Sequence, residues 1–205
     1  MKIDQADAET NRSHTQGGDV MSWIRTIDEA EADGELARVY AGIARKRGKL
    51  SNIMKVQSLD PAAMEAHLEL YMRLLFRKGG LSRAERELLA VVVSVENGCG
   101  YCTLHHAEAL ASWWKDRGRV ERVQDDPASA DLSSREEALV RYARRLTRTP
   151  SEVEESEVEG LRNEGLTDEE ILQANMIIGY FNFVNRVAEG LGVDAPPEEV
   201  EGYRY

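Results

Sequence analysis

Ser82-Arg-Ala-Glu-Arg-Glu-Leu-Leu-Ala-Val-Val-Val-Ser-Val-Glu96 is the segment on which the fold class depends. Its middle, from Leu88 to Val95, is apolar enough to form a buried strand. However, Ser82 followed three residues later by Glu85 is the pattern of a capping box, which marks the start of a helix. The segment then runs on without a helix breaker for longer than a typical strand. It therefore predicts a helix.

Helical patterns continue on both sides of this segment. Asp60 before Pro61 is a typical helix start, Ser134 with Glu137 and Thr167 with Glu170 resemble further capping boxes, and Gly34 precedes an amphipathic stretch. The expected helices cover a segment with Leu36, Val39, Tyr40 and Ile43, then residues 61–78, 82–96, 103–114, 134–149, 152–163 and 168–191. The stretch 118–131 is predicted to be a loop, and Pro196-Pro197 to begin a tail. No segment alternates with period two, so the predicted class is all-α.

The domain organisation follows from length and local composition. Residues 1–20 are polar and contain Gly17-Gly18, which predicts a flexible tail with Met21 as an alternative start. Residues 21–205 are long enough for one domain with its own core.

Charge and hydropathy exclude several classes of function. The 205 residues contain 37 Asp and Glu against 26 Lys and Arg, a formal net charge of −11, which disfavours binding to nucleic acid. The longest apolar run, from Leu88 to Val93, is far too short to cross a membrane. We expect a soluble cytoplasmic protein without a membrane partner. Only two cysteines are present, so a framework of structural disulfides is excluded.

These cysteines form the motif Cys99-Gly-Tyr-Cys102, at the predicted junction of two helices. Helix N-terminal amides stabilise a thiolate, which is the reactive form of cysteine. His106 follows Cys102 by four residues, so both lie on one face of a helix, within reach of proton transfer. His105 points elsewhere and is the weaker candidate.

A histidine in such a pair needs a group that orients it and exchanges its proton. Glu87 lies in an otherwise apolar segment, where an unpaired carboxylate is costly, so His106 is a reasonable partner for it. Glu85, Glu96 and Glu108 are competitors that the residues alone do not eliminate.

The spacing of Glu87, Cys99, Cys102 and His106 resembles the signature of the alkylhydroperoxidase AhpD-like proteins, within the carboxymuconolactone decarboxylase superfamily. Trp23-Ile-Arg-Thr-Ile-Asp-Glu-Ala30, Phe181-Asn-Phe-Val-Asn-Arg-Val-Ala188 and Leu191-Gly-Val193 are similar to its peroxidase-related branch. The resemblance extends over most of residues 23–193. It implies a multi-helical bundle that forms intertwined homo-oligomers, either dimers or trimers of dimers.

The resemblance also implies a function. Cys102 attacks hydrogen peroxide or an organic hydroperoxide, Cys99 resolves the sulfenic acid as a disulfide, and His106 with Glu87 forms a proton relay. A lipoyl-bearing or thioredoxin-like dithiol protein is the implied reductant, and neither a cofactor nor a metal is required. Tyr101 stands where the best-known relatives have histidine. Because tyrosine is not a base near neutral pH, the strength of the peroxidase activity and the reductant stay open.

Other interpretations remain for the same residues. Cys99 and Cys102 are alternatively buried inert thiols, a structural disulfide, or zinc ligands together with His106 or His105. A c-type haem site is excluded because Thr103 stands where its histidine belongs. The alternative functions are a redox-sensing oligomer and a decarboxylase-like lyase. Outside the motif, His14 and His67 are expected at the surface or in the tail, and Trp113-Trp114 in the packing of a helix end or in a subunit contact. Asn182, Asn185 and Arg186 are expected either at the site or in ordinary buried hydrogen bonds.

Overall fold

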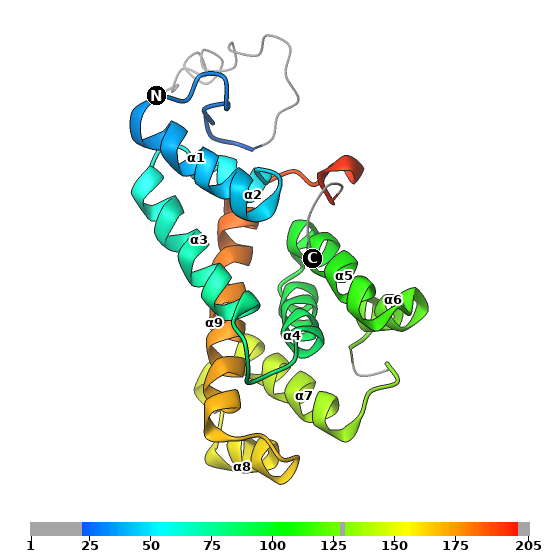
Figure 1. Cartoon of the computed structure of the whole chain (residues 1–205). Coiled ribbons are helices and arrows are strands. Elements are labelled where there is room, and N and C mark those ends of the chain that lie inside the picture. The colour runs from blue at the N-terminus through cyan, green and yellow to red at the C-terminus, as the bar shows by residue number, and fades with distance from the viewer. Residues whose placement is uncertain (1–21, 128–129, 201–205) are drawn as a thin grey trace, which may run out of the picture.

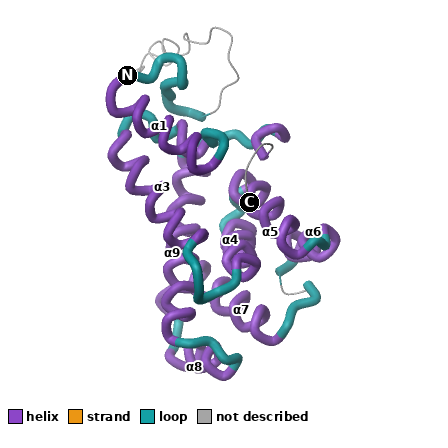
Figure 2. Tube along the Cα trace, viewed as in Figure 1, coloured by secondary structure: helices purple, strands orange, loops and turns teal. Residues whose placement is uncertain are grey.

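The computed structural model describes residues 22–127 and 130–200. Within these ranges all regular secondary structure is helical, and no strand is present (Figure 2). The helices are α1 (Gly34–Arg47), α2 (Asn52–Lys55), α3 (Pro61–Phe76), α4 (Arg83–Glu96), α5 (Gly100–Trp114), α6 (Arg117–Asp125), α7 (Ser134–Arg148), α8 (Glu155–Asn163) and α9 (Asp168–Gly190), with short 3-10 helices η1 (Pro150–Glu152) and η2 (Pro197–Val200). The predicted all-α class is confirmed.

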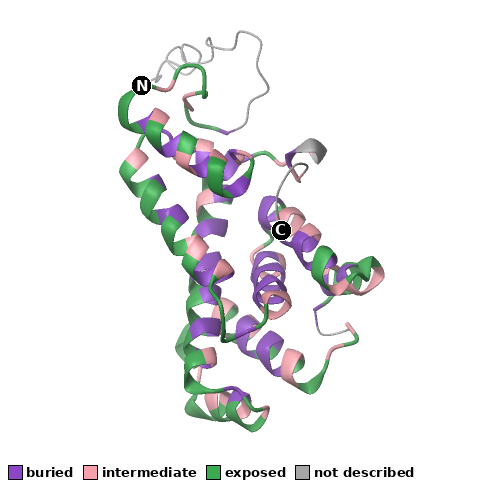
Figure 3. Cartoon of the chain, viewed as in Figure 1, coloured by how far each residue is buried: buried purple, intermediate pink, exposed green. Residues whose placement is uncertain are grey.

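The central helix is α4. It packs against α5, α7 and α9 (Figure 1), and its surface is mostly buried, whereas α3, α6 and α8 expose much of theirs (Figure 3). Every residue from Leu88 to Val93 has an exposed fraction of 0%. The strand-like apolar run is therefore a helix that is enclosed by neighbours on all sides. The buried apolar side chains form one cluster, which extends from Leu36 to Val193.

Side-chain caps set several helix starts where the sequence predicts them. At the start of α4, the Ser82 hydroxyl accepts a hydrogen bond from the Glu85 amide, and the Glu85 carboxylate accepts one from the Ser82 amide. Thr167 and Glu170 form the same reciprocal pair at the start of α9, and Asp60 caps α3. The signal for each of these helix starts is local in the sequence.

The capping box of α7 lies one residue before the predicted position. Ser133 pairs with Glu136, rather than Ser134 with Glu137. The sequence satisfies both registers because each residue type occurs twice in a row. Arg119 also binds the glutamate of the capping box that is formed, because its Nη2 donates to Glu136 Oε2 at 2.7 Å.

The predicted loop over residues 118–131 is wrong for its first half, which belongs to α6. Asp116 caps this helix by accepting a hydrogen bond from the Arg119 amide at 2.9 Å. Val120 and Val123, three residues apart, are its buried residues. An apolar stripe of only two side chains in a charged segment is too weak a periodic signal to indicate a helix.

The two ends of the described chain fold onto the helices. The Trp23 amide donates to the Leu191 carbonyl at 2.8 Å, and the Trp23 ring lies so close to Gly192 that an added Cβ would come within 2.2 Å of it. The predicted flexible segment, residues 1–20, and the alternative start Met21 lie outside the described residues. Across the described ranges, no helix combines the length and apolarity that spanning a membrane requires.

The prediction that Pro196-Pro197 begins a tail is wrong for the residues that follow directly. Glu199 lies within η2, and its side chain is buried against the body of the protein. Its Oε1 accepts a hydrogen bond from the Asn52 amide at 2.7 Å. This contact between residues 147 positions apart leaves no periodic signal in the sequence.

Candidate active site

The two cysteines lie where α4 ends and α5 begins. Gly98 has a φ of 67°, a left-handed conformation that favours glycine and turns the chain after α4. Cys99 is the N-cap residue of α5, and its amide donates to the Ser94 carbonyl at 2.9 Å. Cys102 lies in the first turn of α5. The motif therefore spans a helix start, as the sequence predicts.

Both cysteines are free thiols and both are buried, with exposed fractions of 0% for Cys99 and 3% for Cys102. Although Cys99 lies nearer the helix end, it is the less accessible of the two. Its bond to Ser94 holds it against the end of α4. Cys102 instead lines a cavity, so any approach through that cavity reaches Cys102.

The surroundings of Cys102 favour the protonated thiol in the resting protein. A hydrogen bond with the Cys99 sulfur, burial and the charge of an ionised Cys99 raise the pKa of Cys102 well above its ordinary value, while a hydrogen bond from Asn185 opposes them. The Asn185 side chain is itself fixed, because its Nδ2 donates to Ser94 Oγ at 3.2 Å and its Oδ1 accepts from Asn97 Nδ2 at 3.0 Å. Asn185 thus joins a buried hydrogen-bond network and also contacts the site.

Glu87 and His106 meet directly in the core. His106 Nδ1 lies 2.6 Å from Glu87 Oε2, and Arg83 Nε donates to the other carboxylate oxygen, Oε1, at 2.7 Å. Glu87 has an exposed fraction of 0%. Burial alone would raise the pKa of Glu87, but His106 and Arg83 outweigh it, so this pKa lies below its ordinary value. Glu87 is therefore an ionised carboxylate between two cationic or proton-donating partners.

The competing glutamates each have a different partner. Glu85 lies in the capping box of α4 and binds Arg135 Nε at 2.6 Å. Glu96 pairs with Arg144 and Arg148, and Glu108 pairs with Arg117. Of the four candidates, Glu87 is the one that contacts His106.

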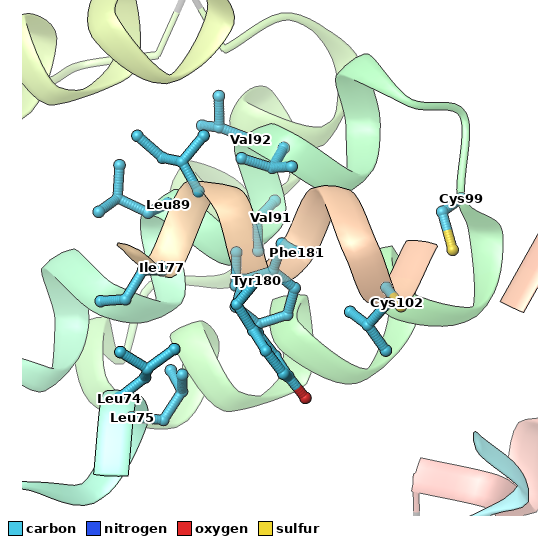
Figure 4. Close-up of a cluster of buried hydrophobic side chains, with 14 of the residues drawn as sticks. Leu74, Leu75, Leu89, Val91, Val92, Cys99, Cys102, Ile177, Tyr180 and Phe181 are labelled. Atoms are coloured by element: carbon cyan, nitrogen blue, oxygen red, sulfur yellow. The ribbon is translucent and has the colours of Figure 1, made fainter. Parts of the chain in front are cut away.

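Cys102 and His106 line the same cavity, which has a volume of about 70 Å³. Its walls come mainly from α1, α2, α3, α5 and α9 and are largely apolar or aromatic. They are formed by Ile43, Arg47, Lys49, Ser51, Ile53, Met54, Leu68, Tyr71, Tyr101, Cys102, His105, His106, Ala109, Tyr180, Phe181 and Val184. A space of this volume is large enough for a small molecule. Figure 4 shows Tyr180 and Cys102 next to the aliphatic core.

Known proteins are similar to this chain in sequence and in fold. The model of the carboxymuconolactone decarboxylase family matches residues 61–145, which include all four predicted site residues. The crystal structure of a peroxidase-related protein with an alkylhydroperoxidase AhpD core, from Ralstonia eutropha JMP134, is similar, with a TM-score of 0.80, 26% identity, and coverage of 88% of this chain and 95% of that one. Over residues 61–145 this chain is similar to that family, and its fold is AhpD-like.

Two further structures show the range of the fold. A peroxidase-related protein from Silicibacter sp. TM1040 has a TM-score of 0.80 and 27% identity, covering 93% of this chain and 99% of that one. The debrominase Bmp8 has a TM-score of 0.70 at 18% identity, covering 90% and 99%, and at that identity the likeness concerns the fold alone. No curated protein matches. Because AhpD-like folds are found in proteins named for different activities, the reaction has to be argued from residues.

Tyr101, which stands where the best-known AhpD-like proteins have histidine, has a structural role in this chain. Tyr101 donates from its hydroxyl to Glu199 Oε1 at 2.8 Å and accepts from the Ile53 amide at 3.2 Å, and its ring stacks on His105 at 4.6 Å between centroids. Despite burial, hydrogen bonds from His105, Asn52 and Tyr101 lower the pKa of Glu199 to about 2. Tyr101 thus ties the C-terminal segment to the cavity wall.

Two residues near the cavity escape prediction from the sequence. Glu199 follows the two prolines and carries no motif. His67 was expected at the surface, but it is buried with an exposed fraction of 6%, because it bonds to both Gln57 and Tyr180. Its position on the apolar face of α3, three residues after Met64 and one before Leu68, was the available signal.

The zinc alternative concerns Cys99, Cys102 and the neighbouring histidines. In the part of the chain that the structure describes, no group of three or more His, Cys, Asp or Glu side chains is arranged to hold a metal ion.

Proposed function

We propose that this chain is a thiol-dependent peroxidase that reduces hydrogen peroxide or small organic hydroperoxides through a cycle of Cys102 and Cys99 between dithiol and disulfide. One observation carries the proposal. Cys102 and His106 line the same cavity, and the buried Glu87 is hydrogen-bonded to His106. In this proposal Cys102 is the nucleophile and Cys99 the resolving thiol.

The first step oxidises Cys102. Its thiol proton passes to Nε2 of His106, and the sulfur attacks the terminal oxygen of the peroxide. The O–O bond breaks, and the leaving alkoxide or hydroxide takes the proton from His106. The products are a sulfenic acid on Cys102 and an alcohol or water, so the sulfur has supplied the two electrons.

The Glu87 contact suits His106 to this task. A carboxylate can only accept at Nδ1, so the neutral ring donates Nδ1–H to Glu87 and keeps its Nε2 lone pair for the thiol proton. Because Arg83 also binds Glu87 and the pKa of Glu87 is lowered, the carboxylate stays ionised. We therefore assign Glu87 the role of orienting His106 and balancing its positive charge, while His106 itself carries the proton.

The second step forms the disulfide. The Cys99 thiol attacks the sulfur of the Cys102 sulfenic acid, an S–S bond forms, and water leaves with the thiol proton. The hydrogen bond between the two sulfurs in the reduced protein supports this step, because the reacting atoms are already neighbours. A dithiol reductant then restores both thiols and becomes a disulfide itself.

The size of the cavity also restricts which kind of reductant can reach Cys102. It leads to Cys102, and its volume of about 70 Å³ is too small to admit a loop of another protein. A slender dithiol such as a lipoyl group fits this access better than a thioredoxin-like protein does. We propose a lipoyl-bearing reductant.

The test is steady-state turnover of hydrogen peroxide and tert-butyl hydroperoxide with dihydrolipoamide and with thioredoxin. We expect saturable multiple turnover that is lost in Cys102→Ser and falls on the order of 100-fold in His106→Gln. Glu108→Gln, on the same helix with its own exposed partner, is the matched control. A single slow oxidation without turnover would instead favour the redox-sensing function.

A further inference from the structure

A second polar chain reaches the cavity, and the mechanism above does not use it. It runs from Gln57, between α2 and α3, through His67 on α3 to Tyr180 on α9. His67 Nδ1 lies 2.9 Å from Gln57 Oε1, and His67 Nε2 lies 2.7 Å from the Tyr180 hydroxyl. Both His67 and Tyr180 are buried, and Tyr180 lines the same cavity as Cys102.

The direction of every hydrogen bond in this chain follows from its first member. Gln57 Nε2 donates to the Ile53 carbonyl at 2.6 Å, which fixes the amide so that Oε1 faces His67. That oxygen can only accept, so His67 Nδ1 carries the proton. Burial lowers the pKa of His67 to about 4, so the ring is neutral near pH 7 and its Nε2 is an acceptor. The Tyr180 O–H must therefore donate to His67.

Tyr180 is thereby left as an acceptor toward the cavity. A phenol has one proton, and this one is bound to His67, so what Tyr180 can offer to the cavity is a lone pair of its oxygen. Burial raises the pKa of Tyr180 well above its ordinary value, which keeps the group a neutral phenol. Its ring is held by Tyr71 and Phe181, at 6.0 and 5.1 Å between centroids. Figure 4 shows the hydroxyl at the end of the ring that points away from the aliphatic cluster.

We propose that the Tyr180 oxygen accepts a hydrogen bond from the O–H of the peroxide and so presents the terminal oxygen to Cys102. The proton in this bond stays on that oxygen and becomes the O–H of the sulfenic acid, while the leaving oxygen takes its proton from His106. His67 and Gln57 are positioning residues that act through Tyr180. The favoured substrate class is hydroperoxides with a small apolar substituent, because most of the remaining cavity wall is aliphatic or aromatic.

This inference rests on the proposed peroxidase function and is tested by presteady-state kinetics on the full chain. The second-order rate constant for Cys102 oxidation by tert-butyl hydroperoxide is compared with that for alkylation by iodoacetamide, which has no O–O–H group. Tyr180→Phe is expected to lower the peroxide rate by about 3- to 10-fold, as for loss of one hydrogen bond, and to leave alkylation unchanged. Tyr142→Phe is the matched control, since Tyr142 is also buried and hydrogen-bonded, to Asn175, but does not line the cavity.

The positioning role of His67 is tested with a double-mutant cycle. His67→Leu alone frees the Tyr180 hydroxyl to rotate and should slow the peroxide reaction. Adding it to Tyr180→Phe should bring no further loss, because the two residues act as a unit. The double variant also replaces both members of the His67–Tyr180 hydrogen bond by apolar groups, so neither is left as an unpaired buried polar group.

The possible results separate this inference from the proposed function. Absence of any wild-type reaction with peroxide overturns both. A wild-type reaction with an unchanged Tyr180→Phe rate, an equal loss of alkylation in that variant, or additive losses in the double variant overturns the inference and leaves the proposed function standing.

Discussion

Glu87 is the single residue on which the site geometry depends most. Its carboxylate is fully enclosed and binds Arg83 on one oxygen and His106 on the other. A buried carboxylate is tolerated only with such partners, and removing the Glu87 carboxylate leaves the Arg83 guanidinium without its counter-charge. A change at Glu87 therefore affects both the stability of the protein and the chemistry of the site.

Glu87→Gln is expected to lower the free energy of unfolding by about 3 kcal/mol, the cost of breaking a buried ion pair, and to slow peroxide reduction. Urea unfolding and steady-state kinetics measure the two effects. Glu108→Gln removes the partner of the exposed Arg117 and should change stability by less than about 1 kcal/mol. A stable, fully active Glu87→Gln variant would contradict the role assigned to Glu87.

The lowered pKa of the buried His67 predicts that the stability of the fold depends on pH. The unfolded chain binds a proton at this residue below a pH of about 6.5, whereas the folded protein does so only below about 4. The free energy of unfolding should therefore fall by about 3 kcal/mol as the pH drops through this window. His105 acts in the same direction, so the informative quantity is the difference between wild type and His67→Leu in urea unfolding at pH 7 and pH 4.5. Parallel pH profiles for the two proteins would refute the assignment.

Residue spacing along one helix was readable from the sequence, and contacts between distant helices were not. Cys102 and His106 are one turn apart on α5, and Glu87 was a reasonable partner because it interrupts an apolar run. By contrast, Tyr180 meets His67 across 113 positions, and neither residue belongs to a motif. Such contacts arise only when the helices pack.

Among the elements, α4 carries the most packing, and its start is defined by one capping box. Ser82→Ala removes the side-chain acceptor of the Glu85 amide and is expected to cost about 1 kcal/mol of stability. Ser112→Ala, at an exposed position inside α5, should cost nothing measurable. Thermal or urea unfolding compares the two. Equal stabilities would show that packing alone defines the start of α4.

Prediction of the elements succeeded where a cap or an apolar face is local. The starts of α3, α4 and α9 follow from Asp60, Ser82 and Thr167. It failed where the signal is short or repeated. The two buried valines of α6 were too few, and the doubled Ser133-Ser134 allowed two registers for α7.

For the whole molecule, the outer face of α9 exposes a row of apolar side chains. Leu172 and Met176 have exposed fractions of 60% and 45%, and Phe183, two turns further along, has 52%. Apolar side chains on one stripe of a helix are typical of association surfaces. We propose that a second copy of the chain covers this row, in keeping with the homo-oligomer, a dimer or trimer of dimers, that the family resemblance implies.

Light scattering with size-exclusion chromatography tests this proposal. The wild-type chain should elute as an oligomer, and Leu172→Glu with Met176→Glu should shift it to a smaller species. Leu70→Glu changes a comparably exposed apolar residue on α3 and should leave the size unchanged. A monomeric wild-type chain, or an unaltered double variant, would contradict the proposal.

The central claim is that Cys102 and Cys99 form a redox pair, and mass spectrometry after one equivalent of hydrogen peroxide tests it most directly. We predict that the chain loses two hydrogen atoms, that peptide mapping finds a single disulfide joining Cys99 to Cys102, and that Cys102→Ser forms none. If both thiols stay free, or if Cys102 accumulates as sulfenic acid without a disulfide, the account is contradicted.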